Sequence, residues 1–406
     1  MKSLIRNIAL LAIACVMIVG CKKDTPEDNT PPQTIIVYMA GVDLSRFFNI
    51  NRNDIKSALD FNIQGKSRVV LFQQTSKTSA KLIEMQFVEN ECQEKILTTY
   101  DLPSQMTANE LGYIFSDIVA RTPSKSHSLI IGAHGLGWIP VGAKPESSAA
   151  YLGKGKHIDM LTHEELWKPK GDIVTRYLGE DSNPQNRFDT TDLAEALTST
   201  GIKLEYILFD ACFMANVESL YDLRNNAKYI IGSPHEIMGD GFPYTNIMPL
   251  MLGNNGASYD LDAICYKFNE FYSTNVGYSG SIALIDCSQL EGLAQAMKRV
   301  NTSAQKIYDV NKIQAYEGQK NHIFYDLGDY VEKMCDNESV KKSFMEQLDR
   351  TVISKYTLDK FYSKYGTRGV YNRVYDIDSF TGMSTSAPSS LYRSAYEQTA
   401  WYKATH

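Results

Sequence analysis

The feature that most constrains the fold is a regular alternation of short apolar segments with amphipathic ones. The apolar segments are rich in β-branched residues and are typical of strands buried in a sheet. The amphipathic segments are longer, and their apolar residues have helical spacing. Strands that alternate with helices predict a mostly parallel sheet covered by helices on both faces, which is an α/β fold. The expected strands are 33–40, 67–73, 81–88 (in an edge hairpin), 126–133, 202–209, 229–233 and 280–286. The expected helices are 45–61, 107–121, 191–199, 213–225, 260–275, 288–308 and 326–350.

The N-terminus predicts export and anchoring. A short basic stretch precedes the apolar segment 8–19, which is too short to cross a bilayer as a helix, so we expect a signal peptide over 1–20. The segment ends in the tetrapeptide IVGC, which resembles a bacterial lipobox and makes Cys21 the lipidated residue. Residues 21–32 are polar and proline-rich and should form a flexible tether. We expect a protein lipid-anchored in the bacterial cell envelope, on the periplasmic or cell-surface side. The alternative is a plain secretory signal with a chance cysteine.

Composition limits the classes of partner and the kinds of chemistry that we expect of the chain. A hydrophobic content of 43% with 11% aromatic residues indicates a globular chain, which we place at 33–406. The net charge of −6 provides no broad basic field, so we expect no nucleic-acid partner. Once the signal peptide is removed and Cys21 is lipidated, an odd number of cysteines is left without a CxxC pair. That pattern argues against a disulfide framework and points to a free thiol. The remaining cysteines are Cys92, Cys212, Cys265, Cys287 and Cys335.

Two of the expected strands end in residues that can carry chemistry. One strand leads to His134 followed by Gly135, and another leads through Asp210 to Cys212, after which a helix is expected. In parallel sheets, sites form outside the carboxyl ends of the strands. A thiolate is favoured at a helix N-terminus, and a nearby histidine can hold or accept its proton. We therefore predict Cys212 as a nucleophile and His134 as its base.

Each of these residues also has an ordinary interpretation. A cysteine after an apolar strand is often just a small buried residue, and a histidine at a strand end is often a turn residue. The two strand ends together are what favour catalysis. Gly135 would let its backbone N–H approach a reacting carbonyl, and with the N–H of Cys212 it could form an oxyanion hole. His235, which follows another strand, is a weaker candidate for the base.

The segments LIIGAHG (129–135) and ILFDACFMANVE (207–218) resemble the two catalytic motifs of the clostripain family of cysteine peptidases. That family belongs with the caspases, legumains and gingipains. The resemblance extends from about residue 33 to the C-terminus, with further similar segments at 230–244, 325–330, 380–388 and 396–401. It implies a caspase-like three-layer α/β/α sandwich and a thiol endopeptidase that acts on proteins or peptides, with His134 as base and Cys212 as nucleophile.

The resemblance also implies a substrate preference. Clostripain-like peptidases cleave after Arg or Lys, and a buried cation in the S1 pocket needs a carboxylate partner. Asp210 and Asp240 match acidic positions that the family uses for the basic side chain. The alternatives are that Asp210 caps the helix after Cys212 and that Asp240 is a turn residue between glycines. Glu236 is a further candidate.

Residues 142–188 interrupt the alternation and read as a long surface insertion. Family members are often cut in this region, sometimes by themselves, and several basic residues here are candidate sites. We expect a monomer, and whether it is nicked into two chains is left open. Clostripain itself depends on calcium, but the sequence contains no EF-hand loop. No cofactor is required by the sequence, no metal ligands are assigned, and calcium is left open.

Two other functions compete with the endopeptidase. One is a catalytically retired lipoprotein that binds peptides or glycans with the same fold, and labelling by a thiol-reactive peptide probe would distinguish it. The other is a hydrolase or transpeptidase that acts on cell-wall peptides, and analysis of its products would separate hydrolysis from transfer.

Overall fold

A computed structural model describes residues 30–59, 67–143, 186–252, 259–319, 321–364 and 373–406. The chain divides into two compact units, 1–30 and 31–406. The expected signal peptide, Cys21 and most of the expected tether and insertion lie outside the described residues. Within the described residues, no helix combines the length and the apolar character needed to cross a membrane.

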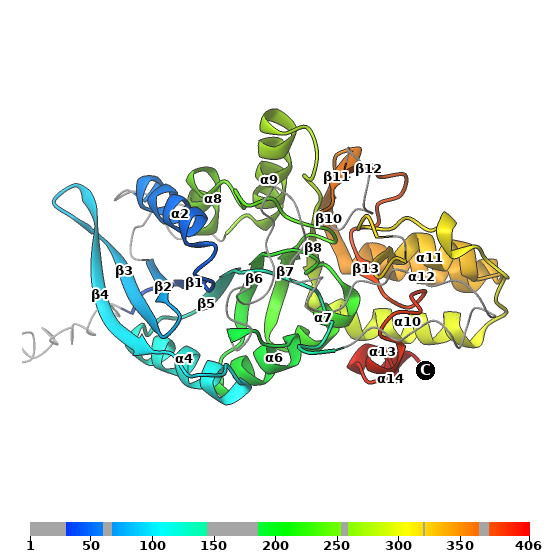
Figure 1. The fold of residues 1–406 in the computed structure, drawn as a ribbon, viewed down its shortest axis with the longest axis horizontal. Helices are drawn as coiled ribbons and strands as arrows, with labels where there is room; N and C mark the ends of the chain where they lie inside the picture. The colour runs from blue at the N-terminus through cyan, green and yellow to red at the C-terminus, as the bar shows by residue number, and fades with distance from the viewer. Residues whose placement is uncertain (1–29, 60–66, 144–185, 253–258, 320, 365–372) are drawn as a thin grey trace, which may run out of the picture. The chain divides into compact units, whose positions relative to one another are not determined.

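The larger unit is organised around a nine-stranded sheet with the strand order β10-β8-β7-β6-β5-β1-β2-β3-β4 (Figure 1). The five central strands, from β7 to β2, run parallel, and antiparallel strands extend both edges. The bounds are β1 Thr34–Met39, β2 Arg68–Ser76, β3 Ser79–Val88, β4 Glu91–Asp101, β5 His127–Gly132, β6 Leu204–Asp210, β7 Ala227–Gly232, β8 Ile282–Asp286 and β10 Val352–Tyr356. Two short antiparallel pairs lie outside it: β11 Lys360–Tyr362 with β12 Val374–Asp376, and β13 Ser384–Thr385 with β9 Tyr325–Asp326.

Helices cover both faces of the sheet, so the three-layer α/β/α prediction is confirmed (Figure 1). Alternate side chains of each strand enter opposite cores: Ile36 and Tyr38 face one layer, Ile35 and Val37 the other. One layer contains α2 Ser45–Ala58, α8 Tyr244–Leu252 and α9 Leu261–Asn275. The other contains α4 Ala108–Arg121, α6 Thr190–Ser199, α7 Val217–Leu223, α10 Leu290–Thr302, α11 Leu327–Met334, α12 Glu338–Thr351 and α14 Ala400–Thr405. The short α13 spans Arg393–Tyr396.

Several boundaries differ from the sequence-based predictions. The strand expected at 280–286 is present as β8 but runs antiparallel to β7, and β4 and β10 were not predicted. The helix expected over 326–350 is two helices, because Asn337 accepts hydrogen bonds from the backbone N–H groups of Ser339 and Val340 and so starts α12 afresh. The helix expected over 288–308 ends at Thr302.

Candidate active site

The sheet brings the two predicted catalytic residues to the same edge. Strands β5 and β6 are parallel neighbours, and Gly132 at the end of β5 pairs with Asp210 at the end of β6. His134 follows Gly132 by the same number of residues as Cys212 follows Asp210. The register therefore sets both residues level with each other outside the carboxyl ends of neighbouring strands. This is where a parallel sheet is expected to hold a site.

Gly135 allows the two strand ends to approach closely. A Cβ at this position would lie 2.3 Å from the carbonyl oxygen of Cys212 and 3.1 Å from its backbone nitrogen. A Cβ contact as short as 2.3 Å is essentially never seen in proteins, so the chain can pass the backbone of Cys212 in this way only with glycine at position 135. The predicted oxyanion-hole residues are thus in backbone contact.

The surroundings of Cys212 correct one prediction. The helix after the cysteine was expected to begin at residue 213, but α7 begins at Val217 and is capped by the Asn216 side chain. Cys212 is therefore not at a helix N-terminus. Instead, its Sγ accepts a hydrogen bond from the backbone N–H of Ile237 at 3.2 Å. This N–H is a donor that can favour the thiolate, while the thiol form donates to the Ile237 carbonyl oxygen at 3.6 Å.

The backbone directly after Cys212 runs beside residues 233–237 and does not form a helix. Phe213 has a positive φ of 60°, and its N–H donates to the carbonyl of His235 at 3.1 Å. The N–H of Ala215 donates to the carbonyl of Ser233 at 3.0 Å. These bonds hold the cysteine against the segment after β7, and the Cys212 side chain is fully buried.

His134 is bonded to a carboxylate that the sequence analysis did not single out. Its Nε2 lies 2.9 Å from Oδ2 of Asp43, and the histidine is 4% exposed. Asp43 lies in the turn between β1 and α2, and β1 is the other neighbour of β5 in the sheet. No periodicity marks this residue; the only signal available was its place just after the first predicted strand.

The two predicted S1 carboxylates differ in their surroundings. Asp210 is fully buried, and its Oδ2 accepts a hydrogen bond from the hydroxyl of Tyr244 at 2.9 Å. Its alternative role as a helix cap is wrong, because Asn216 caps α7. Asp240 is exposed, and its carbonyl oxygen accepts a bond from the Asn51 side chain at 3.2 Å. A turn closed by a Gly241 to Met238 backbone bond presents this aspartate to solvent.

The other candidate residues have environments that suit structural roles. His235 is fully buried, which lowers its pKa to about 4, and its Nδ1–H donates to the Glu236 carbonyl at 2.8 Å. The cysteines of the described residues are free. Burial raises the pKa of Cys287 to about 12 and raises that of Cys265 further, so both thiols stay protonated at neutral pH.

Glu236, the further acidic candidate, is fully buried, and its Oε2 accepts a bond from the backbone N–H of Lys364 at 2.7 Å. Within the described residues, no group of three or more His, Cys, Asp or Glu side chains is placed to hold a metal ion.

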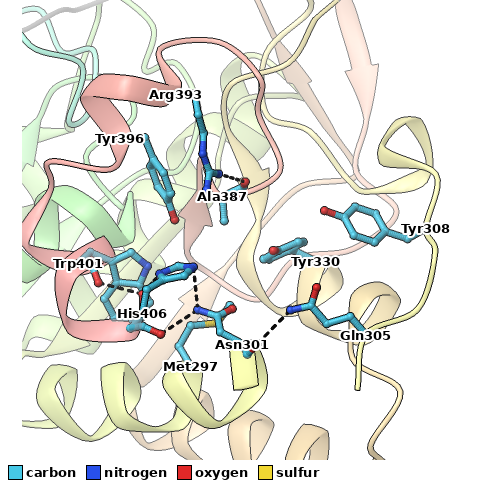
Figure 2. A pocket seen from close by; sticks show the side chains of 11 residues that line it. Met297, Asn301, Gln305, Tyr308, Tyr330, Ala387, Arg393, Tyr396, Trp401 and His406 are labelled. Atoms are coloured by element: carbon cyan, nitrogen blue, oxygen red, sulfur yellow. Dashed lines mark hydrogen bonds between the residues drawn. The ribbon is translucent and has the colours of Figure 1, made fainter. Parts of the chain in front are cut away.

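A separate pocket of about 200 Å³ opens between α10, α11, α13 and α14 (Figure 2). Figure 2 shows the Arg393 guanidinium bonded to the Ala387 carbonyl, and Asn301 bonded to the ring of His406. Arg393 also pairs with Glu397. The residues that line it come from these four helices and the segments beside them, and include none of the predicted site residues.

The chain resembles known proteins in sequence and in fold. A sequence model of the clostripain family matches residues 150–405, which is more than half of the chain. A secreted C11 cysteine protease from Bacteroides thetaiotaomicron, called iotapain, shares 34% identity over 93% of this chain and 99% of its own, with a TM-score of 0.78. Comparison with curated protein sequences gave no match.

Two further solved structures have the same architecture. A secreted C11 cysteine protease from B. thetaiotaomicron in complex with an irreversible peptide inhibitor is 26% identical, covers 92% of this chain and 98% of its own, and has a TM-score of 0.73. An inactive zymogen C11 protease from Parabacteroides distasonis is 24% identical, with a TM-score of 0.72 over 93% of this chain and 99% of its own. The latter likeness concerns the fold alone.

Proposed function

Because the chain belongs to the clostripain family of cysteine peptidases, we propose that it is an endopeptidase that cleaves after Arg or Lys through Cys212 and His134. The observation that carries the proposal is the pairing of Gly132 with Asp210, which sets the histidine and the cysteine level on neighbouring parallel strands. The amide of Ile237 at 3.2 Å from Sγ supports a nucleophilic role for the thiol.

The proposed reaction has two acyl-transfer steps. The Cys212 sulfur attacks the carbonyl carbon of the scissile bond, and His134 takes the thiol proton and gives it to the leaving amine nitrogen. The C–N bond breaks, the amine leaves, and a thioester remains on Cys212. A water molecule that loses a proton to His134 then attacks the thioester carbon, and the carboxylic acid leaves as the thiol is restored. In each step the N–H groups of Gly135 and Cys212 would receive the oxyanion.

The preference for Arg or Lys is proposed to come from Asp240 and Asp210. An exposed carboxylate held in a fixed turn, as at Asp240, can meet an incoming cation without first breaking an internal ion pair. Asp210 lies two residues before the proposed nucleophile, is buried and is bonded to Tyr244. It would therefore act on the substrate cation through its charge, without reaching the surface.

The proposed location is the cell envelope, with the mature chain anchored through a lipid on Cys21. Support comes from the IVGC tetrapeptide and from the secreted Bacteroides proteases that the chain resembles. Mass spectrometry of the mature N-terminal peptide checks this assignment, since an unmodified Cys21 would contradict it.

The first experiment measures cleavage of fluorogenic peptides that end in Arg, Lys, Asp or Leu by the full chain purified in detergent. We expect turnover of the Arg and Lys peptides only, complete loss in Cys212→Ala, and at least a tenfold loss of kcat/KM for both basic peptides in Asp240→Asn. Asp101→Asn, at an exposed aspartate at the end of the edge strand β4, is the matched control for the loss of one charge.

Other outcomes would assign a different function. Turnover that survives Cys212→Ala would remove the cysteine from the mechanism. Turnover of Asp or Leu peptides alone would contradict the proposed preference. No turnover of any peptide, even after nicking with trypsin and addition of calcium, would favour a retired binding protein.

A further inference from the structure

We propose that Asp43 is the residue that positions His134, so that three adjacent parallel strands deliver a triad of Asp43, His134 and Cys212. This inference rests on the proposed function, because it assigns the partner of the histidine in that reaction. The contact that carries it is the 2.9 Å distance from His134 Nε2 to Asp43 Oδ2.

The contact is built into the sheet. Strand β5 lies between β1 and β6, and Met39 at the end of β1 pairs with Gly132 at the end of β5. The pairing continues past the strands, since the N–H of Ala40 donates to the Gly132 carbonyl at 3.0 Å. The chain segments that leave β1 and β5 therefore start side by side, and Asp43 comes from one of them as His134 comes from the other.

The turn that carries Asp43 is fixed at both ends. Before it, the N–H of Gly41, at a positive φ of 124°, donates to the side-chain oxygen of Gln74 on β2 at 3.0 Å. After it, Leu44 is fully buried at the start of α2, and the N–H of Ser45 closes the turn onto the Val42 carbonyl at 3.1 Å. A carboxylate on an anchored turn can hold a ring in one orientation, which a flexible surface residue cannot do.

The bond assigns the two ring nitrogens. A carboxylate accepts only, so Nε2 carries a proton and donates to Asp43. Nδ1 is then the nitrogen that takes the proton from Cys212 and gives it to the leaving amine. The carboxylate also stabilises the imidazolium that forms when the thiol is deprotonated, although its side chain is 26% exposed and solvent weakens that effect.

The test compares Asp43→Ala, Asp43→Asn and Asp43→Glu in the full chain with wild type, Cys212→Ala and a charge control. The control is Asp101→Asn, at an exposed aspartate at the end of the edge strand β4. Three quantities are measured: kcat/KM on an Arg peptide from pH 5 to 9, the rate of Cys212 alkylation by iodoacetamide over the same range, and the thermal midpoint.

We expect Asp43→Ala and Asp43→Asn to lower kcat/KM by about 100-fold, mainly through kcat, with a thermal midpoint within a few degrees of wild type. Alkylation of Cys212 by iodoacetamide should be slower at each pH, because the imidazole is no longer held where it can take the thiol proton. Asp43→Glu should recover part of the rate, and Asp101→Asn should match wild type.

Two results would overturn the inference while leaving the proposed function intact. One is an active wild type, an inactive Cys212→Ala, and Asp43→Ala with unchanged kcat/KM and an unchanged rate of Cys212 alkylation. The other is a loss of rate in Asp43→Ala that follows only the loss of folded protein, with kcat and the rate of Cys212 alkylation unchanged per folded molecule. An inactive wild type, or an active Cys212→Ala, would instead contradict the proposed function itself.

Discussion

At the scale of single residues, the site depends on how closely backbones can approach as much as on which side chains are present. Gly135 shows this most clearly, because the space for its Cβ is already filled by backbone atoms of Cys212. A backbone carbonyl cannot rotate away as a side chain can. Any larger residue must push the end of β5 away from the end of β6.

We therefore expect Gly135→Ala to lower kcat/KM by about 100-fold or more, because it moves both proposed oxyanion donors and the histidine. It should also lower the thermal midpoint, which is measured by circular dichroism beside the peptide assay. Gly292→Ala in α10 is the matched control: its Cβ would meet only the movable Gln347 side chain, and alanine favours a helix. Full activity in Gly135→Ala would show that the close approach is not required.

The sequence predicted part of this residue-scale picture. The placement of His134 and Cys212 at one end of the sheet could be predicted because each follows a recognisable buried strand and the strands run parallel. Asp43 could not, since what matters is the orientation of a turn fixed by Gln74, and no local pattern records that contact. The amide of Ile237 is equally invisible, because every residue but proline has one.

At the scale of elements, the errors of prediction have a common cause: tertiary hydrogen bonds override local propensity. Residues 213–216 are compatible with a helix, but their backbone groups bond to residues 233–235 after β7, so α7 starts only when Asn216 caps it. The apolar residues of β8 are recognisable in the sequence. Its antiparallel direction is not, because it depends on the end of the sheet from which the chain enters after α9. The central parallel strands were predictable because burial on both faces makes them continuously apolar.

The first turn of α7 also contains a buried carboxyl group, Glu218, whose titration should be visible in stability. Its Oε1 accepts bonds from the Thr385 hydroxyl at 2.8 Å and the Ser386 N–H at 3.0 Å, which tie α7 to the C-terminal segment. Burial raises its pKa from 4.5 to about 7. A raised carboxyl pKa stabilises the folded state fully below pH 4.5, and that contribution is lost as pH rises through 7.

Glu218→Gln, whose amide oxygen can keep both bonds, should remove this dependence. We expect the difference in thermal midpoint, variant minus wild type, to increase from pH 5 to pH 8. The increase should correspond to about 2 to 3 kcal/mol in the free energy of unfolding. Glu338→Gln, at an exposed position of α12, should follow wild type at both pH values. Parallel curves for wild type and Glu218→Gln would show that Glu218 does not titrate in this range.

At the scale of the whole molecule, the 142–188 insertion divides the sheet into two sets of strands that are joined by non-covalent contacts. Strands β5 and β6 pair directly across this division. Trp138, before the insertion, donates its indole N–H to the Ser386 hydroxyl at 2.7 Å. The N–H of Val141 donates to Asp189 at 2.7 Å, so the described flanks of the insertion also meet.

We expect active preparations to be cut within 144–185 and to stay assembled. A denaturing gel should resolve two fragments, whereas size-exclusion chromatography should give one species of monomer mass. Cutting should raise activity, because Cys212 is fully buried in the uncut chain. Cys212→Ala should remain a single chain if the enzyme cuts itself. A pure, fully active enzyme that stays in one piece would contradict this expectation.

The direct pairing of β5 with β6 also bears on how the enzyme could be encoded. If the 142–188 insertion is cut, the proposed general base belongs to one polypeptide and the proposed nucleophile to another, so we expect neither fragment alone to be active. Two inactive halves, one carrying His134 and the other Cys212, should then restore activity when produced from separate genes. In such a molecule the covalent link would only keep the two halves together until they fold, and the pairing of β5 with β6 would hold the assembled enzyme together.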